Sequence, residues 1–341
     1  MNAARPIYLQ SCLEPLEPLL EREDVTDIYI NCPGEVWAES LHGNIERHLI
    51  SALDEVMLGR LARQIAAISH QGISREHPLL SARLPDGARV QIVAPPATRG
   101  GMAFAIRKHV SSELSLSDYV AKGAFENTYS GTSSRSSGID EHLKSLLARG
   151  DVAGMLAQAV RARKNILISG GTSTGKTTFL NALLREISGD ERLILIEDTP
   201  ELQLRHANAV GLLASRSNLS EAQVSANDLV AASLRMRPDR IILGELRGEE
   251  AFAFLRAVNT GHPGSMTTIH ADSAERAVEQ LSLLVLQGGT QLTRADVRHY
   301  VRTTIDIFVQ LVRTGGRREV SEVLLWSGSD KKKERGAAGG P

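Results

Sequence analysis

The residues with the clearest chemical potential form a glycine-rich segment near the middle of the chain. This segment fits the phosphate-binding pattern G-x-x-x-x-G-K-[ST]. Glycines let backbone N–H groups turn around phosphate oxygens, and a helix that begins here adds the positive end of its dipole. We expect Lys176 to reach the β- and γ-phosphates and the Thr177 hydroxyl to bind Mg²⁺. The residues expected to hold the nucleotide are Gly170, Gly171, Thr172, Ser173, Thr174, Gly175, Lys176, Thr177 and Thr178.

Carboxylates follow two apolar runs that we expect to be strands. Glu245 ends one of them, where a carboxylate can orient water or hold the water shell of a metal ion. The usual Walker B pattern has aspartate where this chain has Gly244, so an acid must come from elsewhere or Mg²⁺ is held only indirectly. Glu197 and Asp198, which follow the preceding run, are the candidates, because acids gathered near phosphates require a cation. A charged turn that caps a strand is the alternative.

Two histidines lie in the segment 259–271. His270 follows a strand-like run at the expected ligand edge, so it can hydrogen-bond a γ-phosphate and report its loss. His262 lies in a loop rich in glycine and proline. The sequence is compatible equally with a ligand-binding and with a structural role for His262.

The elements that must position these residues alternate between strand and helix. We expect strands near 165–169, 192–197, 241–244 and 266–270, and helices near 176–187, 226–236, 248–259 and 273–287. Such alternation predicts an α/β domain with a mostly parallel sheet, whose ligands bind at the carboxyl ends of the strands. The runs 303–312 and 318–326 predict a closing hairpin.

The amino-terminal part has a different pattern. Hairpins are expected at 25–40 and 83–95, a helix at 53–68 and a strand at 102–106, so residues 1–122 read as a smaller α+β domain. Residues 123–140 are small and polar, which predicts a flexible linker. The α/β domain then spans 141–328, and the Lys/Gly/Ala-rich segment 329–341 is expected to be disordered.

Composition excludes several classes of protein. The 341 residues include 39 Lys plus Arg and 40 Asp plus Glu, and this net charge of −1 argues against a generic nucleic-acid binder. Two cysteines, Cys12 and Cys32, are too few for a disulfide framework or a four-thiolate zinc site. We see no signal peptide and no apolar run of membrane-spanning length, and therefore expect a cytoplasmic protein.

Taken together, the motifs resemble those of the secretion-ATPase superfamily, the hexameric P-loop motors of type II and type IV secretion and pilus assembly. Segment 170–177 corresponds to Walker A, 196–202 to the Asp box, 234–248 to the atypical Walker B motif and 260–271 to the His box. The likeness extends over residues 20–326. The short amino-terminal domain and the run 116–125 most resemble the traffic ATPase of type IV secretion and conjugation systems.

This resemblance implies a RecA-like P-loop domain that binds ATP and Mg²⁺, with roles for the residues above. Glu197 would be the general base or water-orienting acid, and Asp198 beside it would join Thr177 at the metal ion. Glu245 would polarise the nucleotide–metal site, and His270 would contact the γ-phosphate. Preference for ATP comes from the resemblance alone, since we identify no residue that reads the base.

The resemblance also implies that arginines of the amino-terminal domain reach the nucleotide. Arg107 is the best match and would act in catalysis, whereas Arg89 is the second match and would bind the nucleotide. Such an arginine would neutralise transition-state charge and couple hydrolysis to domain closure. Arg247 would serve a subunit boundary. For Arg107 and Arg89, a solvated strand residue is the alternative.

The implied protein is a homohexameric ATPase that is peripheral to the inner membrane through partners in a secretion channel. It would power substrate translocation or pilus assembly, without sequence-specific binding of nucleic acid. A tight-adherence or type II pilus-assembly ATPase is the closest alternative. Two others come from different classes: a nucleotide-gated docking scaffold with little turnover, and an ATPase that translocates nucleic acid, for which an aromatic content of 4% provides few stacking platforms.

Overall fold

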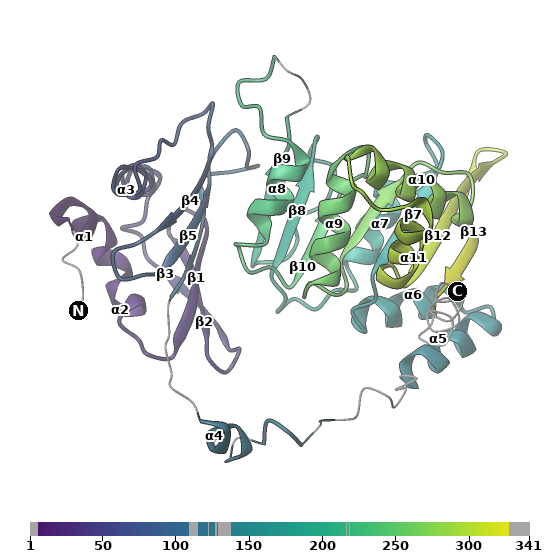
Figure 1. The fold of residues 1–341 in the computed structure, drawn as a ribbon, viewed down its shortest axis with the longest axis horizontal. Coiled ribbons are helices and arrows are strands. Elements are labelled where there is room, and N and C mark those ends of the chain that lie inside the picture. Colours follow the sequence, from purple (N-terminus) through teal and green to yellow (C-terminus); the bar gives the residue numbers. More distant parts are fainter. Residues whose placement is uncertain are drawn as a thin grey trace.

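The computed structural model describes residues 6–108, 115–121, 123–126, 128, 138–215, 217 and 219–326. These residues form two α/β units that lie side by side (Figure 1). The predicted tail 329–341 and most of the predicted linker fall outside the described residues. Within the predicted linker, α5 (Gly138–Ala148) already begins at Gly138.

The amino-terminal domain is a six-stranded antiparallel sheet with short helices on one face. The strands are β1 (Val25–Cys32), β2 (Glu35–Ser40), β3 (Ile45–Leu49), β4 (Leu79–Arg83), β5 (Arg89–Val93) and β6 (Ala103–Arg107), in the order β3-β2-β1-β6-β5-β4. The helices are α1 (Ile7–Leu13), the 3₁₀ turn η1 (Glu14–Leu16), α2 (Glu17–Leu20) and α3 (Glu55–Ile68). Both predicted hairpins, the helix and the strand are present, whereas β3 and the first helices were not predicted.

Alternation along the strands gives the amino-terminal sheet two buried faces. Ile28 and Ile30 of β1 pack with leucines of α1 and α3, and Tyr29 between them packs with the second domain. Asp54 caps the start of helix α3, because its side chain accepts a hydrogen bond from the Met57 N–H. One turn further on, the helix buries Leu58. The sheet therefore joins its own helices to the other domain.

The carboxy-terminal domain is a seven-stranded sheet that is parallel except for its last strand. The order is β13-β12-β7-β11-β10-β8-β9. The strands are β7 (Ile166–Gly170), β8 (Leu193–Glu197), β9 (Ala209–Leu213), β10 (Arg240–Leu243), β11 (Met266–Ile269), β12 (Ile307–Thr314) and β13 (Arg317–Leu325). The mostly parallel sheet is thus confirmed, and the final hairpin pairs β12 with β13.

Helices cover both faces of this sheet. Residues of α5, α6 (Val152–Arg161) and α7 (Lys176–Leu184) form one buried cluster with the sheet. Residues of α8 (Ala226–Ser233), α9 (Glu250–Asn259), α10 (Ala274–Gln287) and α11 (Arg294–Thr304) form the other. The sequence placed a strand from residue 303, but α11 runs to Thr304, because a Thr293–Asp296 capping box starts it and Val297 and Val301 bury one face.

The two domains dock through β9, the edge strand opposite β13 in the carboxy-terminal sheet. Thr98 of the amino-terminal domain forms an antiparallel bridge with Leu212, and the Arg99 N–H donates to the Gly211 carbonyl over 2.9 Å. Nearby, the fully buried Arg192 side chain inserts into the amino-terminal domain, where its guanidinium lies 4.0 Å from the centroid of the Tyr29 ring. Burial lowers the pKa of Arg192 to about 10.

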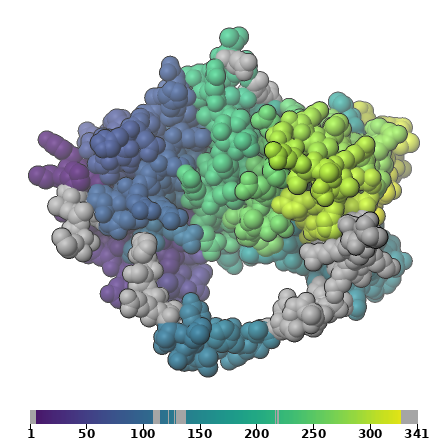
Figure 2. Space-filling model, viewed as in Figure 1, coloured from purple at the N-terminus to yellow at the C-terminus, as the bar shows by residue number. Residues whose placement is uncertain are grey.

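Helix α4 (Leu116–Ala121) lies apart from this docked body (Figures 1 and 2). It has no buried residue. In the described residues, no helix is long and apolar enough to cross a membrane.

Candidate functional site

The phosphate-binding pattern forms the turn between β7 and α7, at the carboxyl end of an interior strand of the sheet. Strand β7 is buried along its length between β11 and β12. Gly175 has a φ of +90° and precedes the first residue of α7, so the loop needs glycine there. Gly170 has no space for a side chain, because an added Cβ would lie 2.8 Å from the Leu311 carbonyl oxygen. The backbone N–H groups at the start of α7 therefore face the open edge of the sheet.

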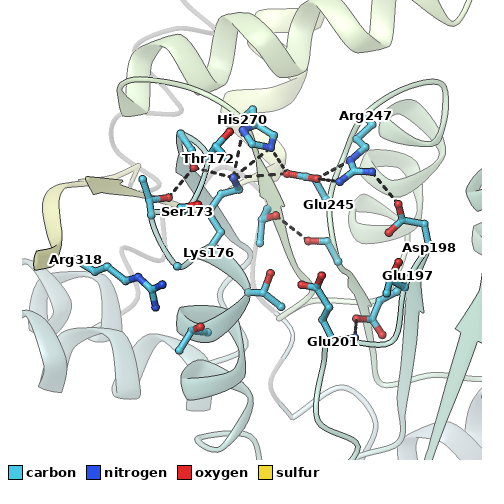
Figure 3. Close-up of a pocket in the computed structure, with 18 residues that line it drawn as sticks. Thr172, Ser173, Lys176, Glu197, Asp198, Glu201, Glu245, Arg247, His270 and Arg318 are labelled. Carbon is cyan, nitrogen blue, oxygen red and sulfur yellow. Dashed lines mark hydrogen bonds and ion pairs between the residues drawn. The ribbon is translucent and has the colours of Figure 1, made fainter. Parts of the chain in front are cut away.

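A cavity of about 430 Å³ opens at this edge. Figure 3 shows its side chains converging from the loop, from the ends of β8, β10 and β11, and from β13. It is lined by Gly171, Thr172, Ser173, Thr174, Gly175, Lys176, Thr177, Thr178, Glu197, Asp198, Thr199, Glu201, Gly244, Glu245, Arg247, Thr268, His270 and Arg318. The structure thus brings together all the expected nucleotide-binding residues except Gly170 and Arg89.

Lys176 is the buried cation of the cavity. Its ammonium donates to the carbonyls of Gly170 at 3.0 Å and Gly171 at 3.3 Å, and it lies 3.6 Å from a Glu245 oxygen and 3.4 Å from the His270 ring nitrogens. Burial lowers the pKa of Lys176, an effect that the nearby Glu245 carboxylate opposes. The ammonium is therefore held against the loop, beside the Glu245 carboxylate and the His270 ring.

Glu245 is the carboxylate closest to this cation. It follows β10, and one of its oxygens lies 2.9 Å from Nε2 of His270, which is half exposed at the end of β11. Arg247 pairs with the other oxygen and also with Asp198, at 2.8 Å. The expected neighbours Lys176, Glu245 and His270 thus form one contiguous group (Figure 3).

Glu197 also lines the cavity, but both of its carboxylate oxygens are already engaged by other groups. One accepts the backbone N–H groups of Glu201 at 2.9 Å and Leu202 at 2.8 Å. The other pairs with Arg99 of the amino-terminal domain. The Glu197 side chain is only 3% exposed, so it is poorly placed to take a proton from a water molecule in the cavity.

Gly244 explains how Glu197 fits beside the cavity. A Cβ added at Gly244 would lie 3.0 Å from Cγ of Glu197. The Glu197 side chain therefore occupies the space that an aspartate at the usual Walker B position would need. The acid that the sequence suggested on the neighbouring strand thus lies beside Gly244, but it is buried.

Oxygen donors suited to a hard cation also line the cavity. Thr177 is the second residue of α7, and Asp198 and Thr199 follow β8. The Thr199 hydroxyl is buried and has no hydrogen-bond partner among the described residues. Those residues hold no group of three or more His, Cys, Asp or Glu side chains able to bind a metal ion alone. The donor set fits Mg²⁺ held jointly by protein oxygens and phosphates.

Arg318 is a lining residue that sequence reasoning missed. It comes from β13 and lies across the loop from Glu245 (Figure 3). Its guanidinium Nη1 lies 3.7 Å from where a Cβ of Gly175 would be. Among the described residues it has no ion pair. No motif in the sequence joins Arg318 to the phosphate loop, because the two are more than 140 positions apart.

Arg107 and Arg89 do not reach this cavity. They face each other on β6 and β5 and line a second cavity of about 530 Å³, together with Arg83, Arg235, Arg237 and His262. The Arg107 side chain is 65% exposed, and its nearest carboxylate is Asp27 at 3.9 Å. His262 lies 2.9 Å from the Pro238 carbonyl, and burial lowers its pKa. In this arrangement, Arg99 and not Arg107 or Arg89 contacts an acid of the nucleotide cavity.

Comparison with known proteins gives consistent matches. Residues 141–326 match the family described as type II/IV secretion system protein. The type IV secretion system protein VirB11 of Bartonella henselae is 41% identical, over 96% of this chain and 94% of the relative. The type IV secretion system protein PtlH homolog of Bordetella bronchiseptica is 40% identical, over 96% of this chain and 99% of the relative.

A solved structure agrees with these matches. The crystal structure of the VirB11 ATPase from the Brucella suis type IV secretion system, in complex with sulphate, superposes with a TM-score of 0.89. The two chains are 37% identical, and the match covers 96% of this chain and 97% of the other.

Proposed function

Because the chain belongs to the family of type II/IV secretion system proteins, we propose that it is the ATP-hydrolysing motor of a type IV secretion system. The observation that carries this proposal is the grouping of Lys176, Glu245 and His270 around a cavity at the phosphate loop. A lysine on the phosphates and a residue that orients the attacking water are groups that P-loop enzymes use in phosphoryl transfer, and the His270 imidazole adds a hydrogen-bonding group beside them. The motor powers substrate translocation or pilus assembly.

The nucleotide-binding step follows from the loop. The carboxy-terminal domain is of the RecA-like kind, and N–H groups of the loop and of the first turn of α7 receive the phosphates of ATP. Lys176 exchanges its two carbonyl partners for phosphate oxygens, and the hydroxyls of Thr177 and Thr178 stand at the same helix start. Arg318 adds a second cation on the other side of the loop.

We assign the orientation of the attacking water to Glu245, although sequence reasoning gave this role to Glu197. Glu245 points into the cavity beside Lys176, whereas the two oxygens of Glu197 are bound by backbone amides and by Arg99. A group that accepts a proton must lie within hydrogen-bond reach of it. His270 holds Glu245 on one side and contacts the γ-phosphate, so loss of that phosphate changes the hydrogen bonds of both residues.

Mg²⁺ accompanies ATP in this proposal. Thr177 and Asp198 would hold the ion together with phosphate oxygens. Mg²⁺ would neutralise the negative charge that develops during phosphoryl transfer. Arg247 pairs with Asp198 and Glu245, and thus offsets the repulsion between the two acids until Mg²⁺ binds.

Arg107 and Arg89 fit the motor as residues that act on a neighbouring subunit. They line an arginine-rich cavity away from the phosphate loop of their own chain, and Arg107 is largely exposed. In a homohexameric ring, this face meets the next protomer, where its cations would neutralise transition-state charge. The ring lies in the cytoplasm and binds the inner membrane through components of the secretion channel.

Phosphate release by the purified protein tests the catalytic assignment. We expect Lys176→Ala to abolish turnover and Glu245→Gln to lower kcat by about 100-fold, within the range of general acid–base catalysis. Glu249→Gln is the matched control, because Glu249 is exposed and does not line the cavity. Light scattering on the same samples should show a ring of about six subunits in every variant.

Two results would change the proposal. A wild type that binds ATP but turns it over no faster than Glu245→Gln would indicate a nucleotide-gated scaffold. Full activity in Glu245→Gln together with loss in Glu197→Gln would return the water-orienting role to Glu197. For the arginines, mixing Arg107→Ala with Lys176→Ala subunits should restore activity, since each intact site can then pair with an intact arginine.

A further inference from the structure

Arg99 belongs to the amino-terminal domain, but its side chain ends inside the carboxy-terminal domain. One terminal nitrogen donates to the Leu202 carbonyl over 2.7 Å, and the other pairs with the Glu197 carboxylate. The Arg99 side chain is 14% exposed. One arginine therefore bridges both ends of the segment 197–202.

The path of this side chain is built into the domain contact. The Arg99 N–H donates to the Gly211 carbonyl, and the Leu213 N–H donates to the Ala97 carbonyl, each over 2.9 Å. The side chain then crosses Gly211, where an added Cβ would lie 2.5 Å from Cδ of Arg99. Only glycine at position 211 of β9 leaves room for the Arg99 side chain to cross the strand.

The segment 197–202, which we call the acidic loop, lies at the nucleotide cavity. Asp198, Thr199 and Glu201 line that cavity, and the loop closes on itself through the Glu201 and Leu202 amides, which donate to Glu197. Its shape thus depends on where the Glu197 carboxylate is held.

We propose that Arg99 is a positioning residue through which the docking of the amino-terminal domain sets the shape of the acidic loop. The contacts of Arg99 with Glu197 and Leu202 exist only while the segment 97–99 is paired with β9. Undocking breaks them together and leaves a buried carboxylate without its cation, so the loop must rearrange to hydrate it. This inference deepens the proposed motor function and rests on it for its consequence in turnover.

Amide hydrogen exchange without nucleotide tests the proposal independently of catalysis. In Arg99→Met, the amides of Glu201 and Leu202 should exchange about 5- to 150-fold faster than in the wild type, the range expected for coupled sites. Arg99→Lys should restore part of the protection, because an ammonium can pair with Glu197 but cannot fork to Leu202.

Arg75→Met is the matched control. Arg75 also joins the two domains, through an exposed pair with Glu221, but it lies away from the acidic loop. It should leave the Glu201 and Leu202 amides unchanged. The Leu213 amide, which donates to Ala97, reports in each variant whether the domains are still docked.

Unchanged exchange at Glu201 and Leu202 in Arg99→Met would overturn the proposal. So would an equal rise in Arg75→Met, because that result would indicate general loosening. Turnover is the second readout: Arg99→Met should lower kcat with little change in KM, since phosphate binding belongs to the P-loop. If the wild type showed no turnover, the motor function would fall while the exchange result still decided the role of Arg99.

Discussion

Gly244 occupies the position at which the usual Walker B pattern has aspartate. From the sequence alone, Gly244→Asp would therefore be expected to complete the motif. The structure predicts the opposite. An added Cβ would lie 3.0 Å from Cγ of Glu197, and the carboxylate beyond it would enter the space that Glu197 already fills. We expect this variant to be less stable and less active than the wild type.

The magnitude follows from two effects. Crowding in a packed region costs about 1–3 kcal/mol. Two carboxylates about 4 Å apart repel by about 4 kcal/mol at an effective dielectric constant of about 20, and the cation of Arg99 offsets part of this. Together they predict a loss of about 3–5 kcal/mol in the free energy of unfolding. For a domain of this size, Tm falls by about 2–4 °C per kcal/mol, and therefore by about 6–20 °C.

A double-mutant cycle with thermal unfolding measures the interaction. Gly244→Ala isolates the crowding from the charge. In a Glu197→Ala background, Gly244→Asp should cost at least 2 kcal/mol less than in the wild type, on the order of the coupling seen between contacting residues. An equal cost in both backgrounds would refute the reasoning, because Glu197 would then not be what the new side chain meets.

Three further predictions concern single side chains. In steady-state kinetics, Arg318→Ala should raise the KM for ATP about tenfold, because it removes a charged contact with the nucleotide. The neighbouring variant Arg317→Ala should leave the KM unchanged, since the Arg317 side chain is 84% exposed and pairs with Glu319. Arg240→Met should lower the free energy of unfolding by about 3–5 kcal/mol in denaturant titrations, because it leaves the Glu191 carboxylate buried without its bidentate partner; adding Glu191→Leu should recover most of this loss. The free energy of unfolding should depend on pH through Asp27, because burial raises the pKa of this carboxyl above 3.8. The contribution of its protonated form to stability is complete below pH 3.8 and is lost as pH rises through the raised pKa. Asp27→Asn should therefore be more stable than the wild type at pH 7, and this advantage should vanish below pH 3.8; an advantage that persists there would contradict the assignment.

The part of the site that could be predicted is local in sequence. The glycine loop, Glu245 and His270 each follow an apolar run, and the carboxyl ends of parallel strands meet at one edge of a sheet. Their convergence therefore needed only the correct strand assignments, which β7, β10 and β11 confirm.

What could not be predicted depends on contacts between distant segments. Arg318 reaches the loop because the predicted hairpin of β12 and β13 pairs with β7 through β12, a position in the sheet that the strand pattern does not reveal. Arg99 was missed because its partner Glu197 lies in the other domain, and no periodicity encodes domain docking. The sequence also does not show on which chain the arginines Arg107 and Arg89, expected to reach the nucleotide, would meet it.

The pairing of residues 97–99 with β9 has a consequence for solubility. β9 is the terminal strand of its sheet, and Val210, Gly211 and Leu212 in it are buried. A terminal strand with unpaired backbone groups and apolar side chains is a template for association with other chains. The amino-terminal domain covers that template in the docked form. Each undocking event in a working cycle would expose it briefly, within reach of identical copies, so fast re-docking would also protect the assembly from aggregation.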